Sequence, residues 1–167
     1  MKRIVCIVLA VAVVLLQMSL LPALRPFGVV PNLMLVFVVL MGLEGTASSA
    51  LVVALAGGLA LDFASGADFG LWTGVLTLAA LLTGMVHRAG LELKSIWPAV
   101  ALVVAGTIVM AVILLLGLVN AVGVWPVGGL AVRVVTEVII NLLLMLAVRP
   151  LVRWAASGLQ AGVMPIG

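Results

Sequence analysis

The sequence predicts an all-α membrane protein in which residues 1–167 form a single bundle of six transmembrane helices. Hydrophobic residues make up 66% of the chain and charged residues 8%, whereas charged residues are roughly a quarter of a soluble domain. Eight basic and five acidic side chains cannot cover the surface of a soluble domain of this size. The apolar runs are long and do not alternate, which indicates helices, because the strands of a membrane β-barrel are short alternating segments.

The first predicted helix covers residues 4–24 and follows the basic pair Lys2 and Arg3. At about 1.5 Å of rise per residue, it is long enough to cross a hydrocarbon core of about 30 Å. Its apolar region is longer than that of a secretory signal, and no small-x-small cleavage site follows it. We therefore expect this helix to be retained and to span the membrane.

A Pro-Asn pair opens the second predicted helix, residues 31–43. This helix is short for a spanning segment, so we expect it either to tilt little or to thin the bilayer locally. A Glu-Gly pair separates it from the third, residues 46–62, which is rich in Ala and Gly. A turn containing Ser, Gly and Asp precedes the fourth, residues 71–87. These boundaries divide the first half of the chain into closely spaced helices.

The fifth and sixth predicted helices cover residues 98–119 and 130–148. The most hydrophilic loop precedes the fifth helix, and Pro98 suits its first turn because proline lacks a backbone N–H. A segment rich in Gly and Pro separates the two helices. An Arg-Pro pair is expected to end the sixth.

The basic residues predict that both ends of the chain lie in the cytoplasm. With six helices and a cytoplasmic N-terminus, only Arg25 lies in an outer loop, while Arg133 lies within a helix. The bases placed inside are Lys2, Arg3, Arg88, Lys94, Arg149 and Arg153. Five helices would place the basic C-terminal segment outside, so we expect the even number.

Small residues at i,i+4 spacing form a ridge on the third predicted helix. Ala50, Ala54 and Gly58 share one face, and Asp62 follows one turn later at the outer end. Small side chains let neighbouring helices approach closely. Two interpretations stay open: ordinary packing with a solvated Asp62 at the helix end, or a docking point that the ridge holds rigid.

Arg133, Glu137 and Asn141 form a polar stripe on the sixth predicted helix. A charged side chain at the bilayer centre costs roughly 2.5–3.5 kcal/mol on insertion scales, so the stripe should face protein or water. Arg133 can extend to the surface, but Glu137 lies deeper and needs a partner. Because Asp62 is expected at a similar depth, we predict a network of Asp62, Arg133 and Glu137 that is either structural or part of a partner site.

Candidate catalytic, metal and cofactor sites are few. One His, one Cys and no Tyr leave few combinations, and the spacings typical of metalloproteases, serine hydrolases and paired carboxylates are missing from the sequence. The glycines form neither a P-loop nor a dinucleotide fingerprint, and the bases are too dispersed for a nucleic-acid site. We expect no enzymatic activity, no cofactor or metal, and no nucleic-acid partner.

Several short motifs are spread over nearly the whole chain. After a basic N-terminus and first helix come Pro31-Asn32-Leu33, Gly57-Gly58-Leu59-Ala60-Leu61-Asp62, Gly70-Leu71, Asn141-Leu142-Leu143 and Pro150-Leu151. Together they resemble the rod-shape-determining protein MreD family. On this resemblance Pro31, Asn32, Gly58, Asp62, Gly70 and Asn141 fall on matching positions. Arg133 and Glu137 match no motif of the family.

The resemblance implies a non-enzymatic subunit of the bacterial cell-elongation machinery in the inner membrane, which helps organise lateral peptidoglycan synthesis. It implies the bitopic shape protein MreC as the partner, with MreB filaments and the elongation-specific wall synthases as further partners. MreD proteins are similar in topology to the six-helix substrate-binding subunits of energy-coupling-factor transporters. The alternative function is therefore a substrate-binding subunit of a vitamin-type transporter, although the lack of Tyr counts against a ligand pocket. The oligomeric state, including a homo-oligomer, is left open.

Overall fold

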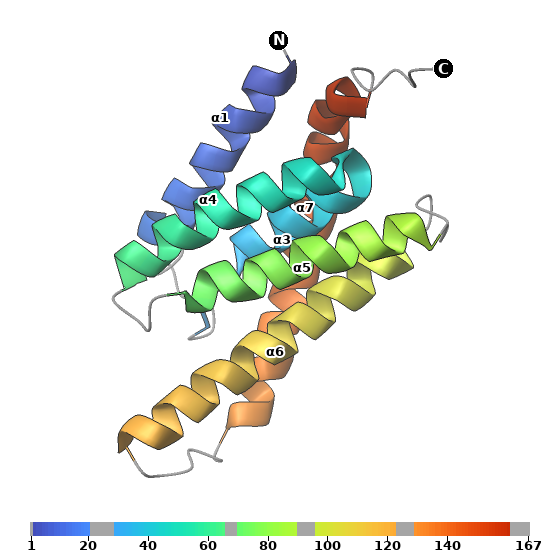
Figure 1. The fold of residues 1–167 in the computed structure, drawn as a ribbon. Coiled ribbons are helices and arrows are strands. Elements are labelled where there is room, and N and C mark those ends of the chain that lie inside the picture. Colours follow the sequence, from blue (N-terminus) through green and yellow to red (C-terminus); the bar gives the residue numbers. More distant parts are fainter. Residues whose placement is uncertain (1, 21–28, 66–69, 90–95, 123–128, 161–167) are drawn as a thin grey trace.

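A computed structural model describes residues 2–20, 29–65, 70–89, 96–122 and 129–160 (Figure 1). Within these ranges the chain is all-helical and contains no strand. The helices are α1 (Lys2–Leu15), α3 (Leu33–Leu40), α4 (Ala47–Ser65), α5 (Leu71–Arg88), α6 (Trp97–Val122) and α7 (Leu130–Gln160). Two π-helical turns, η1 (Leu16–Leu20) and η3 (Met41–Gly45), continue α1 and α3. The predicted all-α class with six helices is confirmed.

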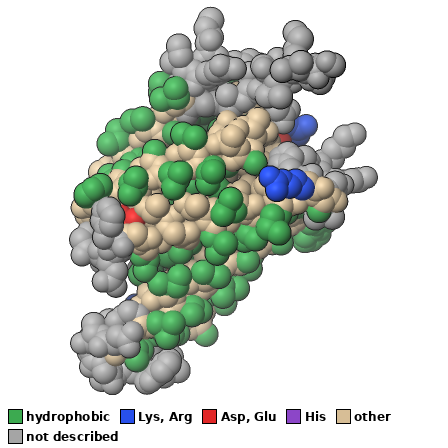
Figure 2. All heavy atoms as spheres, viewed as in Figure 1, with side chains coloured by type: hydrophobic (Ala, Val, Ile, Leu, Met, Phe, Trp, Pro, Cys, Tyr) green, Lys and Arg blue, Asp and Glu red, His purple; other side chains and the backbone are tan. Residues whose placement is uncertain are grey.

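Three helices are long and apolar enough to cross a membrane. Their candidate spans are Ala47–Ser65, Trp97–Leu116 and Leu130–Ser157, and shorter apolar helices cover Ile7–Ser19, Leu33–Gly45 and Leu71–Val86. Hydrophobic side chains cover much of the face in Figure 2, and the few visible charged side chains lie near helix ends. Such a surface matches an apolar solvent.

The short helix α3 forms the centre of the bundle. Every residue of α3 is buried, and α3 packs against α1, α4, α5, α6 and α7. A fully apolar helix of this kind is buried on all sides. Neighbouring helices rather than lipid therefore surround the short second helix, so its length does not require a thinner bilayer.

The last helix is longer than the sequence suggested. It does not end at residue 148 but runs for 31 residues to Gln160, with Pro150 inside it. Proline removes one backbone hydrogen bond, which ordinarily kinks or ends a helix. Beyond it, however, Val152, Ala155 and Ala156 are fully buried, so packing of this face offsets the loss. In Figure 1, α1 begins and α7 ends at the same end of the bundle.

Candidate functional site

Asn141 joins three helices at the N-terminal end of α3. Its side chain is fully buried, and its Oδ1 accepts a hydrogen bond from the backbone N–H of Asn32 at 2.8 Å. Its Nδ2 donates to Thr107 Oγ1 on α6 at 3.0 Å. Side-chain hydrogen bonds between helices contribute on the order of 1 kcal/mol in a membrane. Asn141 therefore links α7, α6 and the start of α3.

The first backbone N–H groups of α3 all have side-chain acceptors. The Oε1 atom of Gln17 accepts from Leu33 at 2.8 Å and from Met34 at 3.4 Å. The Oδ1 atom of Asn32 accepts from Leu35 at 3.0 Å, as an N-cap residue does. Unpaired N–H groups at a buried helix end would be costly, because water is excluded there. These caps let α3 begin inside the bundle.

Asp62 caps the next helix rather than pairing with a base. Its carboxylate oxygens accept from the backbone N–H groups of Trp72 at 2.8 Å and Thr73 at 3.1 Å, and from Thr73 Oγ1 at 2.5 Å. A carboxylate at a helix N-terminus also interacts favourably with the helix dipole. Because Asp62 is 3% exposed, it is neither solvated nor available as an exposed docking point.

The small-residue ridge lies on the buried side of α4. Ala50 and Ala54 are fully buried, and Gly58 lies directly against the backbone of α5. A Cβ atom on Gly58 would lie 2.5 Å from Cα and 2.9 Å from N of Thr73. The absence of a side chain at Gly58 thus allows α4 and α5 to meet where Asp62 forms its hydrogen bonds.

The structure does not bring Asp62, Arg133 and Glu137 together. Within the described ranges, Arg133 is exposed and forms no ion pair with either acid. Glu137 likewise has no hydrogen-bond or ion-pair partner among the described residues. The expected network fails because the hydrogen bonds at the start of α5 hold Asp62, while Arg133 projects outward from α7. Of the three residues in the polar stripe, Asn141 is the one that forms hydrogen bonds to other parts of the described chain through its side chain.

An ion pair that sequence reasoning missed joins η3 to α7. Glu44 Oε1 lies 2.6 Å from Arg149 Nε, and their side chains are only 11% and 18% exposed. Arg153 Nε lies 3.8 Å from Glu44 Oε2, with its side chain 72% exposed. The sequence suggested that both arginines only mark the cytoplasmic side. Because α7 continues through Pro150, one turn of helix presents both of them to Glu44.

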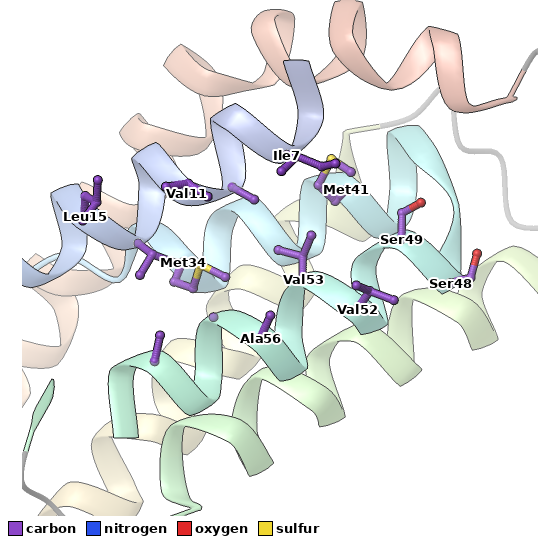
Figure 3. Close-up of a pocket in the computed structure, with 14 residues that line it drawn as sticks. Ile7, Val11, Leu15, Met34, Met41, Ser48, Ser49, Val52, Val53 and Ala56 are labelled. Carbon is purple, nitrogen blue, oxygen red and sulfur yellow. The ribbon is translucent and has the colours of Figure 1, made fainter. Parts of the chain in front are cut away.

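A groove of about 590 Å³ opens between α1 and α4. Helix α3 and η3 contribute Met34 and Met41 to its floor, and the walls are apolar except for Ser48 and Ser49. The lining side chains labelled in Figure 3 are Ile7, Val11, Leu15, Met34, Met41, Ser48, Ser49, Val52, Val53 and Ala56. The groove extends along α4 from Ser48 to Ala60, about 18 Å at helical rise.

A second hollow, of about 400 Å³, lies at the N-terminal end of α3, and we call it the chamber. Glu137 contributes to its lining, together with Asn32 and Trp72. The chamber shares no lining residue with the groove. Glu137 therefore belongs to a cavity rather than to a salt-bridge network.

The side chains of the described ranges include no group of three or more His, Cys, Asp or Glu residues that could hold a metal ion. His87 and Cys6 lie outside the side chains that are described. No protein-family model, curated protein or solved structure matches the chain.

Some of these residues carried a recognisable signal in the sequence. Gln17 is a lone amide in a long apolar run, and polar side chains inside membrane helices usually face other helices. Glu44 lies between two apolar runs and requires a partner by the same reasoning. Thr73 and Thr107 carried no such signal, because threonine is common in membrane helices and can bond to its own backbone, as Thr107 does to Val103.

Proposed function

We propose that the protein is a non-enzymatic, six-span membrane subunit that binds the single transmembrane helix of a partner, as an MreD-type protein would bind MreC. The groove between α1 and α4 is the observation that carries this proposal. Its length of about 18 Å covers more than half of a hydrocarbon core of about 30 Å. A partner helix lying in it would be in contact over several turns.

The composition of the groove favours a helix as its occupant. Ala56 and Ala60 lie along its α4 side, and small residues let two helix backbones approach closely. Met34 and Met41 on the floor are almost fully buried in the core, so they give the groove an apolar base. At one end, the Ser48 and Ser49 hydroxyls provide polar contacts in an otherwise apolar surface. Close packing with a few hydrogen bonds drives helix association in lipid.

The proposed location is the bacterial inner membrane, with both ends of the chain in the cytoplasm. The arrangement of basic residues supports this orientation. Six crossings are consistent with α1 beginning and α7 ending at the same end of the bundle (Figure 1). Binding to MreC would link the chain to MreB filaments and to the synthases of lateral peptidoglycan.

Blocking the groove tests the proposal. Val52 lines the groove and is 66% exposed, so Val52→Trp fills it from the α4 side without disturbing the core. The matched control is Val135→Trp on α7, since Val135 is 57% exposed and lines neither hollow. Each variant is co-expressed with a tagged single-span MreC-type protein and purified through the tag in mild detergent.

We expect Val52→Trp to lower recovery of the complex by about tenfold or more, since a clash at a packed interface costs more than about 1.4 kcal/mol. Val135→Trp should be recovered like the unchanged protein. Equal recovery of both variants would show that the partner does not occupy the groove. If the unchanged chain binds no MreC-type protein, the proposed function is contradicted.

A specific observation favours the transporter alternative as the second candidate. A substrate-binding subunit requires a pocket near one membrane face with a few polar groups in an apolar lining. The chamber has this composition, with Glu137 and Asn32 among mainly apolar residues. Transport would require that a ligand bind in the chamber.

A further inference from the structure

The chamber lies where six elements of the fold meet. Its lining comes from η1, the segment before α3, the end of α4, the start of α5, and from α6 and α7. The lining residues are Gln17, Met18, Val30, Asn32, Leu61, Ala64, Ser65, Trp72, Met110, Leu114 and Glu137. Its volume of about 400 Å³ lies within the range of small-molecule sites, roughly 300–1,000 Å³.

Most polar groups of this lining are already engaged. Gln17 uses its Oε1 on the N–H groups of α3, and its Nε2 donates to the Pro31 carbonyl oxygen at 3.1 Å. Ser65 Oγ contacts the backbone carbonyl of Asp62 at 3.5 Å. These side chains hold the chamber in shape and are not free to bind a ligand strongly.

Two polar side chains of the lining differ from the others. Asn32 is 2% exposed, and its Nδ2 has no hydrogen-bond partner among the described residues. The carboxylate of Glu137 also lacks a partner within the described ranges. A buried polar group without a partner, such as Asn32 Nδ2, is rare in native proteins and requires an explanation, whereas Glu137 is only partly buried. Both of them lie in the lining of the same hollow.

The position of Glu137 selects the charge of a ligand. It lies about two turns into α7 from Leu130, where a carboxylate is costly unless it meets a cation or a hydrogen-bond donor. Arg133 lies one turn away on the same helix but is exposed and does not line the chamber. A ligand that brings a positive charge would therefore offset the cost of placing Glu137 there.

The remaining lining selects the rest of the ligand. Met18, Leu61, Met110 and Leu114 form an apolar surface suited to a hydrocarbon body. Trp72 also lines the chamber, and indole rings attract organic cations through their π electrons. A metal ion would find one carboxylate, Glu137, in this lining, because the amide oxygens of Gln17 and Asn32 already accept hydrogen bonds from α3.

We propose that the chamber binds a small amphipathic ammonium compound, with the ammonium group at Glu137 and the apolar body among the methionine and leucine side chains. An oxygen atom on the same compound would accept the hydrogen bond that Asn32 Nδ2 otherwise lacks. This site is separate from the groove, so it does not depend on partner binding. Its existence would fit either a transporter subunit or a scaffold that a ligand regulates.

Three probes of similar size and different charge test the proposal: phenethylamine, 2-phenylethanol and phenylacetate. Each is titrated against the purified full chain in mild detergent, and the midpoint of thermal unfolding is recorded. We expect phenethylamine to raise the midpoint and to bind at least about tenfold more tightly than 2-phenylethanol, because charge-assisted hydrogen bonds are stronger than neutral ones. Phenylacetate should give no shift, because its carboxylate would face Glu137.

Glu137→Gln should remove the preference for the amine over the alcohol. Arg133→Gln is the matched control on the same helix, and it should keep that preference. If Glu137→Gln does not fold, Leu114→Trp replaces it, because a larger side chain fills the apolar part of the chamber and should abolish the shift by phenethylamine.

Two outcomes overturn the proposal. One is equal binding of the three probes to the unchanged chain, including no binding of any of them. The other is a preference for the amine that persists in folded Glu137→Gln or, where that variant does not fold, a shift by phenethylamine that persists in Leu114→Trp; either result would place the amine in the detergent or at another surface.

Discussion

Replacing Gly58 with alanine tests how closely α4 and α5 must pack. The added Cβ atom would lie 2.5 Å from the Cα atom of Thr73, and ordinary contacts between carbon atoms begin near about 3.5 Å. The obstacle is backbone, which cannot rotate away as a flexible side chain can. The two helices must therefore separate locally by about 1 Å. That movement also stretches the hydrogen bonds from Trp72 and Thr73 to Asp62.

Gly74 provides the matched control, because it lies in α5 and an added Cβ meets nothing within 4 Å. Overpacking costs about 1–3 kcal/mol, and alanine gains up to about 1 kcal/mol over glycine inside a helix. We expect Gly58→Ala to lower the free energy of unfolding by about 1–2 kcal/mol, since the clash exceeds the gain in helix propensity. Gly74→Ala should raise it by about 0.5–1 kcal/mol.

The measurement is equilibrium unfolding of both variants in mixed micelles with increasing dodecyl sulfate, followed by circular dichroism. The difference between the two variants, about 1.5–3 kcal/mol, is the decisive quantity, because detergent effects common to both cancel. A Gly58→Ala variant as stable as Gly74→Ala would contradict the close approach of α4 to α5. A shared loss in both variants would instead show that glycine in these helices serves flexibility rather than packing.

Two further predictions concern polar contacts and use the same unfolding assay. A double-mutant cycle of Asp62→Asn with Thr73→Val should give a coupling energy of about 0.5 kcal/mol or more, because the two side chains are hydrogen-bonded. The losses of stability from Asp62→Asn and Arg133→Ala should instead add within about 0.5 kcal/mol. A larger coupling energy between Asp62 and Arg133 would support the network expected from the sequence. Arg149→Ala should lower the free energy of unfolding by about 1–3 kcal/mol, because it removes the short, largely buried ion pair with Glu44. Arg153→Ala should lower it by about 0–1 kcal/mol, because the Arg153 side chain is mostly exposed. Equal losses for the two arginines would contradict this difference.

Helix positions were predictable because they depend on local properties of the chain. Apolar runs separated by Pro, Gly and charged residues predicted six helices, and the described ranges contain six α-helices. The end of α7 was not predictable, because Pro150 is a helix breaker in local terms. Burial of Val152 and Ala155 decides that the helix continues, and burial depends on the neighbours of α7.

Some polar residues of the candidate site were predictable, but their partners were not. Asn141 was singled out as a polar residue inside a helix, and the structure shows it bonded to Asn32, 109 positions earlier in the sequence. Asp62 and Glu137 were expected to share Arg133. The spacing of residues on one helix gave no information about the start of α5. The first N–H groups of α5 have no acceptor within their own helix, and those of Trp72 and Thr73 donate to the Asp62 carboxylate instead.

Composition and the placement of charges were enough to predict helices that face an apolar solvent, since transfer free energies depend on residue type and run length. Packing was needed to show that α3 is enclosed by other helices, that Glu44 meets Arg149 across 105 positions, and that Glu137 lines a chamber. The physical reason is that a polar group in lipid must find a partner, but many partners are compatible with the same helices. Close approach at a few small residues, such as Gly58, selects among them.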